Sequence, residues 1–213
     1  NLIGIQNFQL KTRLKNILMI NRKLFYNYFK RLFDIIVSII LIILLSLPIF
    51  IISIFILTID KHAPFYLSKR VGKNNQIFLM PKFRTMKKNT PQVATHLFVN
   101  HNDITFLGKV LRKTSLDELP QLFTIFIGKM SIVGPRPALF NQYDLIELRN
   151  NKNIQSILPG LTGLAQINGR DLISIEDKVL FDEVYLQKRS FFYDIVIIIK
   201  TFIFIIKPTN IKH

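Results

Sequence analysis

The apolar residues of this chain are concentrated in one uninterrupted run. Residues 35–59 read IIVSIILIILLSLPIFIISIFILTI, 25 residues without a charged side chain. As an α-helix this run would be about 37 Å long at about 1.5 Å per residue, longer than the ~30 Å hydrocarbon core of a bilayer. It is too long for the apolar region of a signal peptide, and no small-residue cleavage site follows before Asp60. The pattern therefore predicts a helix embedded in a membrane.

A proline in the middle of the run predicts a bend. Pro48 has no backbone N–H to donate, and its ring clashes with the preceding helical turn. Ser46 is near enough to donate to a carbonyl group that such a bend frees. Basic residues, which favour the cytoplasmic side, flank the run at both ends: Lys30 and Arg31, then Lys61, Lys69 and Arg70. A bent helix that enters and leaves the same face of the membrane keeps both basic flanks on the cytoplasmic side. A straight span places one of them on the far side. From these features alone, both the bent helix and the straight span stay open.

Two further segments have the composition of helices at a membrane surface. Residues 1–29 combine basic and aromatic side chains, which predicts an amphipathic helix on anionic lipid, with a solvated tail as the alternative. Residues 191–206, FFYDIVIIIKTFIFII, are very apolar but contain Asp194 and Lys200. We interpret this second segment as an interfacial helix, with a buried core helix as the alternative.

Between these segments the pattern changes to short elements. APFYLSK (63–69) and QIFLMPKFRTM (76–86) predict strands, with a turn at 72–75. A short helix is expected over 115–127, ended by Gly128. The remaining expectations are an extended segment at 131–137, a glycine-rich loop system at 158–171, and a helix from Ser174 to about Lys188 with Asp177 at the capping position.

The strongly positive net charge of the chain indicates which kinds of molecule it binds. Lys and Arg number 29 against 13 Asp and Glu, a net charge of +16, which favours an anionic partner. Beside a membrane segment, lipid explains this charge better than nucleic acid, for which the sequence has no motif. The absence of cysteine excludes disulfides, thiolate chemistry and Cys-ligated zinc. There is no GxxxxGK[ST] or GxGxxG loop, and the four histidines lack metal-site spacing.

Two adjacent carboxylates stand out in this basic chain. Asp117 and Glu118 lie in LRKTSLDELPQLFTIF (111–126), where Ser115 to Glu118 matches a capping box. A helix cap is therefore one interpretation. Consecutive helix residues point about 100° apart, so the two groups could instead serve different tasks. One carboxylate could attack phosphorus while the other holds Mg²⁺ on phosphate oxygens.

Several basic residues are candidates for binding the anion. Arg136 lies between Pro135 and Pro137, which lowers the entropy lost when its guanidinium is oriented on a phosphate or a base. For each candidate a solvated or lipid-facing charge is the alternative. The full set is Lys69, Arg70, Lys82, Arg84, Arg112, Arg136 and Arg170.

Taken in order, several stretches resemble a known family. They are KRLFDIIVS (30–38), the proline-containing run, RVGKNNQIF (70–78), KFRTM (82–86), LRKTSLDELPQL (111–122), MSIVGPRP (130–137), PGLTGLAQINGR (159–170) and YDIVIIIKT (193–201). Together they resemble the bacterial sugar transferases, monotopic phosphoglycosyl transferases that begin glycan assembly on a polyprenol phosphate. The likeness is to the small members, which lack a large N-terminal membrane domain.

The resemblance implies a ping-pong reaction. A UDP-sugar would transfer its sugar-1-phosphate to Asp117 with release of UMP, and polyprenol (undecaprenyl) phosphate would then take it. By motif, Asp117 is the nucleophile and Glu118 its partner, the two together holding Mg²⁺. Arg112 would bind phosphate and Arg136 the nucleotide. Positioning roles fall to Lys82, Arg84 and Arg170.

The resemblance also implies an architecture. It is α+β and mainly helical, with a re-entrant helix–break–helix at Ser46 and Pro48 and a small catalytic domain with short strands and interfacial amphipathic helices. Its place is the cytoplasmic face of the bacterial inner membrane, where further glycosyl transferases could follow. The expected divisions are 1–29, a basic amphipathic segment; 30–60, the re-entrant helix; 61–206, the catalytic domain; and 207–213, a tail.

Two other functions compete with this one. A membrane-anchored protein could bind anionic lipid or a polymer without catalysis, with the two carboxylates as a cap. A conventional glycosyl transferase would release UDP, although the sequence lacks the separated Asp-x-Asp metal motif that many of those enzymes use. An N-acetylated UDP-hexosamine is the donor that family analogy favours.

Overall fold

A computed structural model describes residues 2–87, 90, 103–169 and 172–206, with side chains described from Leu24 to Phe204. The expected tail at 207–213 lies outside the described residues. The helices are α1 (Leu2–Phe55), continued by a π-helical segment (Ile56–Asp60), α2 (Phe106–Lys113), α3 (Gln121–Phe126), α4 (Tyr143–Asn151), α5 (Leu164–Ile167), α6 (Ile175–Lys188) and α7 (Phe191–Ile206). The strands are β1 (Phe65–Val71), β2 (Ile77–Phe83), β3 (Ser131–Val133) and β4 (Gly160–Thr162). The prediction of a mainly helical chain with short strands is confirmed.

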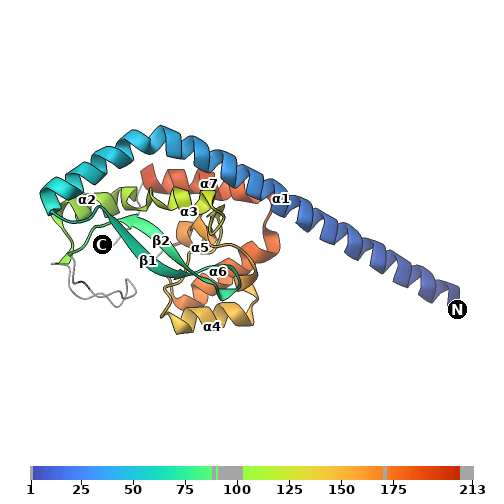
Figure 1. Ribbon diagram of the computed structural model, residues 1–213. Coiled ribbons are helices and arrows are strands. Elements are labelled where there is room, and N and C mark those ends of the chain that lie inside the picture. The colour runs from blue at the N-terminus through green and yellow to red at the C-terminus, as the bar shows by residue number, and fades with distance from the viewer. Residues whose placement is uncertain (1, 88–89, 91–102, 170–171, 207–213) are drawn as a thin grey trace.

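The long apolar helix bends without an interruption in its secondary structure. Pro48 lies inside α1, and the helix also continues through residues 29 and 30, so the first two expected segments form one element. The carbonyl of Leu44 loses its usual donor because Pro48 has no N–H. Ser46 Oγ donates to the neighbouring carbonyl of Ile43 at 2.8 Å. Figure 1 shows α1 arching over the body of the molecule.

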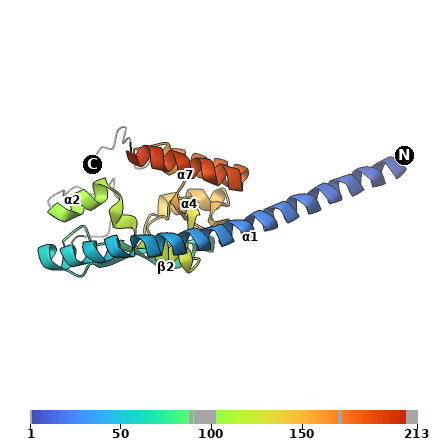
Figure 2. The same cartoon turned by 90° about the horizontal axis from the view of Figure 1, so that it is seen from above.

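The elements of the body lie under this arch. In Figure 1, α3 lies beneath α1, which it contacts, and the β1–β2 hairpin, α6 and α4 lie further below. Seen from above in Figure 2, α1 and α7 run along opposite sides of the body, and the N-terminal part of α1 projects away from it. Among the residues that the structure describes, one helix, Leu24–Asp60, is long and apolar enough to cross a membrane.

Both halves of the apolar helix pack on the same body. Before Pro48, Phe33, Val37 and Leu41 contact the central core, which includes Leu122 and Ile125 of α3. After Pro48, the helix contributes to a second cluster, made of Ile49, Ile52, Ile56, Phe83 and Leu111 with their neighbours. The outward side of α1 stays exposed, with Leu44 and Leu47 at 69% and 65%.

The side chains of the hairpin alternate between its two faces over most of its length. β1 and β2 pair antiparallel, with Ser68 opposite Met80. Ser68, Phe78 and Met80 are buried on the inner face, while Leu67 and Leu79 are exposed on the outer one. Asn74 and Asn75 in the turn have positive φ angles of 53° and 60°, which asparagine tolerates better than most residues. The predicted strands and turn are confirmed.

The glycine-rich segment is more regular than predicted. Residues 160–162 form β4, which pairs parallel with β3, and α5 follows immediately. A Cβ atom at Gly160 would lie 2.1 Å from the backbone nitrogen of Gly134, so this close pairing requires glycine. The prediction of a loop was wrong for these residues because their order depends on a partner strand elsewhere in the chain. The prediction for α6 is confirmed, since Ser174 Oγ accepts from Asp177 N at 3.0 Å.

A glycine also determines how closely α2 approaches the rest of the body. A Cβ atom at Gly108 would lie 2.2 Å from the carbonyl oxygen of Thr85. We therefore expect Gly108→Ala to push α2 outward and destabilise the protein by about 1–3 kcal/mol. Thermal unfolding in detergent would measure this loss. The exposed residue Lys109 provides the control, because Lys109→Ala should leave the midpoint unchanged. Equal midpoints for both variants would contradict the close packing of α2.

Candidate active site

The carboxylate pair lies on a short connection between α2 and α3. Leu116–Glu118 form one 3₁₀ turn, and Pro120 immediately precedes α3. Ser115 has a left-handed backbone (φ 57°, ψ 15°), and its side chain makes no capping hydrogen bond. The capping-box interpretation was therefore wrong, since an N-cap residue needs an extended backbone to accept from the following turn. Within the turn that follows, Leu116 is exposed, whereas the side chains of Asp117 and Glu118 are buried.

Both carboxylates are buried although the chain is strongly basic. Asp117 and Glu118 are 9% and 8% exposed. Glu118 Oε1 accepts from Lys82 Nζ at 2.8 Å and from Arg136 Nη2 at 2.9 Å. Lys82 comes from β2 and Arg136 from the segment after β3, so three distant parts of the chain meet at one oxygen atom. A buried carboxylate between two cations is a stable arrangement only when such partners are held in place.

The second carboxylate lies in the same field of charges. Burial raises the pKa of Asp117, and the adjacent Glu118 raises it further. The positive charges of Lys82, Arg112 and Arg136 act in the opposite direction. A carboxylate whose pKa is raised is more basic than an exposed aspartate and has lost part of its water shell. Both effects favour a nucleophile that must reach an electrophilic phosphorus atom.

The lysine of this cluster is shielded from water as well. Its side chain is 14% exposed, and burial lowers the pKa of Lys82, while the charge of Glu118 raises it. Because Lys82 shares one carboxylate oxygen with Arg136, both cations face the dyad from their own side. This arrangement offers two positive groups to an incoming phosphate without leaving either of them unpaired beforehand.

Arg112 joins the cluster through the close packing of α2. Its Nε donates to Thr85 Oγ1 at 2.9 Å, and its charge acts on Asp117. Thr85 is the residue whose backbone excludes any side chain at position 108. The structure therefore brings together Lys82, Arg112, Asp117, Glu118 and Arg136, all of which the sequence singled out.

The other basic candidates have different surroundings. Arg84 Nε donates to the Ala63 carbonyl at 3.1 Å, and its guanidinium lies over the Tyr66 ring. Arg70 Nη1 donates to the Pro137 carbonyl at 3.1 Å, beside the segment that carries Arg136. Lys69 lies over the ring of Phe140. Arg170 is outside the described residues, and the roles of Arg84 and Arg170 in substrate binding stay predictions.

One buried ion pair behind the site was missed by the sequence analysis. Arg149 of α4 donates to Asp182 of α6 through Nε (3.0 Å) and Nη2 (2.6 Å). Its Nη1 donates to the backbone carbonyl of Arg136 at 2.9 Å. Burial raises the pKa of Asp182, and Arg149 opposes this shift. The pair fixes the segment that presents Arg136, and no local motif marks it because its members are 33 positions apart.

The dyad has the donor atoms that suit a magnesium ion. Among the described residues no group of three or more His, Cys, Asp or Glu side chains comes together, so an all-protein metal cage is not present there. Asp117 and Glu118 nevertheless provide hard oxygen donors on consecutive residues of one turn. Mg²⁺ is commonly held by one or two carboxylates, with phosphate oxygens and water completing its shell. The residues present therefore fit this ion together with a phosphate ligand.

Comparison with known proteins shows the family of this chain. The chain matches the family model described as "Bacterial sugar transferase" over residues 25–208. It is 40% identical over 189 residues to the exopolysaccharide production protein ExoY of Sinorhizobium fredii, covering 81% of this chain and 83% of the relative.

Longer relatives carry more specific names. One is the undecaprenyl-phosphate galactose phosphotransferase of Salmonella typhimurium, 36% identical, with 82% of this chain aligned to 40% of that protein. Another is the UDP-glucose:undecaprenyl-phosphate glucose-1-phosphate transferase of Klebsiella pneumoniae, 37% identical, with 81% of this chain aligned to 39% of that protein. The family match covers most of the chain and includes every residue of the charged cluster, so this chain belongs to the bacterial sugar transferase family.

Proposed function

We propose that the protein transfers a sugar-1-phosphate from a UDP-sugar to a polyprenol phosphate and releases UMP. The observation that carries this proposal is the buried pair Asp117 and Glu118, surrounded by Lys82, Arg112 and Arg136 in a chain of this family. Relatives named for undecaprenyl phosphate and for UDP-glucose support the class of acceptor and donor.

The chemistry proposed for the dyad has two steps. An oxygen of Asp117 attacks the phosphorus that carries the sugar, and the bond from that phosphorus to the UMP oxygen breaks. UMP leaves with the electron pair, and Asp117 holds the phosphosugar as an acyl phosphate. An oxygen of the lipid phosphate then attacks the same phosphorus and displaces Asp117. The products are polyprenyl-diphosphate-sugar and free enzyme.

The cations of the cluster stabilise negative charge during both steps. Phosphoryl transfer places charge on the oxygens around phosphorus, and preformed positive groups lower the barrier without reorganising. Lys82 and Arg136 are already held on Glu118, and Arg112 is held on Thr85. Asp117 and Glu118 would hold Mg²⁺, whose charge would polarise the diphosphate of the donor.

The packing of α1 supports a helix that enters and leaves one face of the membrane. Residues on both sides of Pro48 contact the same body, through Val37 and Leu41 before it and Ile52 and Ile56 after it. A helix that crosses a bilayer would carry one of these contact regions to the far side. We therefore propose a re-entrant helix with the catalytic domain at the cytoplasmic face, where the acceptor's phosphate group lies.

Exposed apolar side chains on neighbouring helices support the same placement. Phe106 on α2 is 83% exposed, and Lys109 and Lys113 are exposed on the same helix. On α7, Asp194 and Ile197 face the protein while Phe192 and Phe202 are exposed, which is the amphipathic division of an interfacial helix. The site would thus lie level with the lipid phosphates rather than above them.

The nucleotide product tests this function. Purified protein would receive Mg²⁺, polyprenol phosphate and a panel that includes UDP-glucose, UDP-galactose and UDP-N-acetylhexosamines. We expect the protein to release UMP. Continued release beyond the first turnover should require polyprenol phosphate, because the lipid phosphate regenerates free Asp117. UDP would mean that the sugar alone is transferred, as in a conventional glycosyl transferase. Neither nucleotide, together with tight binding of anionic vesicles, would favour the alternative of a membrane-anchored binding protein.

A further inference from the structure

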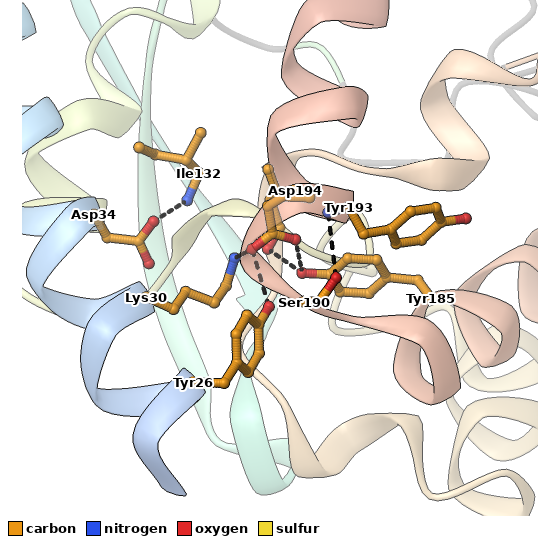
Figure 3. Close-up of polar contacts among 9 residues, drawn as sticks. Tyr26, Lys30, Asp34, Ile132, Tyr185, Ser190, Tyr193 and Asp194 are labelled. Atoms are coloured by element: carbon orange, nitrogen blue, oxygen red, sulfur yellow. Dashed lines mark hydrogen bonds and ion pairs between the residues drawn. The ribbon is translucent and has the colours of Figure 1, made fainter. Parts of the chain in front are cut away.

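One turn of the membrane helix binds three separate elements of the body. Figure 3 shows Lys30 of α1 directed at Asp194 of α7. Lys30 Nζ lies 2.6 Å from Asp194 Oδ2. Four residues further along α1, Asp34 Oδ1 accepts from the backbone nitrogen of Ile132 of β3 at 3.1 Å. Tyr26 and Tyr185 also donate to the carboxylate of Asp194, at 2.9 and 2.8 Å. Arg31 lies between Lys30 and Asp34 in this segment, and it is bound to α3.

The contact between Arg31 and α3 caps the end of that helix. Arg31 Nη1 donates to the Ile125 carbonyl and Nη2 to the Phe126 carbonyl, both at 2.7 Å. These carbonyls belong to the last turn of the helix, which carries partial negative charge. The Ile125 carbonyl also accepts from Gly128 N at 3.0 Å, so Arg31 adds a second donor there. Gly128 has a φ of 85°, and a Cβ atom there would lie 3.1 Å from Arg31 Nη2. Glycine therefore leaves room for the guanidinium to reach both oxygens.

The other end of the same helix joins the carboxylate pair. α3 has six residues, and Leu119 and Pro120 alone separate it from the turn that carries Asp117 and Glu118. Leu122 and Ile125 are buried against α1, so the helix is held along its length as well as at its end. A displacement of so short a helix along or about its axis would move the dyad relative to Lys82 and Arg136.

We propose that Arg31 is a positioning residue for the transfer reaction, which sets the location of Asp117 and Glu118 by holding the far end of α3. The proposal rests on the proposed function of the dyad, because its kinetic effect is an effect on that reaction. Arg31 does not touch the reacting atoms. It transmits the position of the membrane helix to the active site, so the anchor and the nucleophile form one rigid unit.

The conservative variant Arg31→Lys tests the contact without changing the charge beside the membrane. Lysine has no planar fork, so it cannot reproduce the pair of parallel bonds to two carbonyls. We expect kcat to fall at least tenfold, since misplacing reacting groups by about 1 Å can cost on the order of 100-fold. The KM for the UDP-sugar should stay within about twofold, because the cations that bind the donor remain in place.

A second variant moves the guanidinium while retaining it. In Gly128→Ala the added methyl group would crowd Arg31 Nη2, and the positive φ would also strain the backbone, so kcat should fall at least as far. The double variant should lose less than the product of the two single losses, because both changes disturb the same Arg31 contact. Lys129→Gln is the matched control, since Lys129 is exposed in the same loop, and its kcat should equal that of the wild type. Multiplied losses in the double variant would overturn the proposal.

Amide hydrogen exchange provides a measurement that does not depend on turnover. We expect faster exchange over residues 116–127 in Arg31→Lys and no change in Lys129→Gln. Faster exchange confined to residues 125–127, with kcat unchanged, would show a cap that does not act on the dyad and would overturn the proposal. If the wild type makes no UMP, the proposed function fails first, and exchange at residues 116–118 still decides whether Arg31 positions the turn.

Discussion

Replacing Asp117 by Asn is expected to abolish sugar-phosphate transfer while leaving the protein folded. The amide has nearly the same shape but cannot attack phosphorus, and loss of a nucleophile commonly costs roughly 10⁴-fold or more in turnover. The rate of UMP release would measure the effect. Asp144→Asn is the matched control, because Asp144 is exposed on α4 and should not affect turnover.

The stability of the same variant should not decrease. Burial raises the pKa of Asp117 above its ordinary value. A carboxylate with a raised folded-state pKa costs stability once the pH is high enough to ionise it, and this cost is absent at pH values below its unfolded pKa. At neutral pH, Asn removes that cost, so we expect a melting temperature in detergent at least equal to that of the wild type. An active Asp117→Asn protein would exclude this nucleophile and favour another function.

Replacing the neighbouring Glu118 by Gln is expected to have the opposite effect on stability. Lys82 and Arg136 would each lose an ionised partner, and Lys82 is only 14% exposed. Leaving a buried cation without a counter-charge can cost on the order of 3 kcal/mol, which the retained amide oxygen would reduce. Turnover should fall about 100-fold or more, because removal of a single electrostatic group from a preformed site has effects of this size.

Magnesium dependence distinguishes the metal role of Glu118 from its role as a counter-charge. We expect Glu118→Gln to need a higher Mg²⁺ concentration for half-maximal activity, since an amide oxygen is a weaker ligand than a carboxylate. An unchanged requirement would mean that Glu118 serves only to hold Lys82 and Arg136. Glu147→Gln provides the control for loss of one negative charge, because Glu147 is exposed on α4.

Local patterns predicted the elements that depend on neighbouring residues. Two short apolar segments with an intervening turn at 72–75 predicted the hairpin of β1 and β2, and Ser174 marked the start of α6. All five residues of the charged cluster were candidates from the sequence, because they lie in short motifs and bear the charges that phosphate chemistry requires. The structure adds that these motifs meet at one oxygen of Glu118.

Contacts between distant parts of the chain could not be predicted in this way. Arg31 is separated from Ile125 by 94 positions. From the sequence, Arg31 was interpreted only as a basic residue that flanks the apolar run and favours the cytoplasmic side. Arg149 and Asp182 are ordinary charged residues of two helices until their packing is known. The left-handed backbone of Ser115 also has no local signal, because serine at that spacing is typical of a helix cap.

Side chains of the apolar helix α1 form part of the hydrophobic core, so a soluble form of the protein cannot be made by removing this helix. Deleting residues up to Asp60 would expose Leu122, Ile125 and Phe83 to water and would remove the side chains that bind α3, α7 and β3. A soluble enzyme would instead require the helix to be kept and its outward side chains made polar. Ile40, Ile43 and Leu47 are the first positions to change, because they are 56–69% exposed.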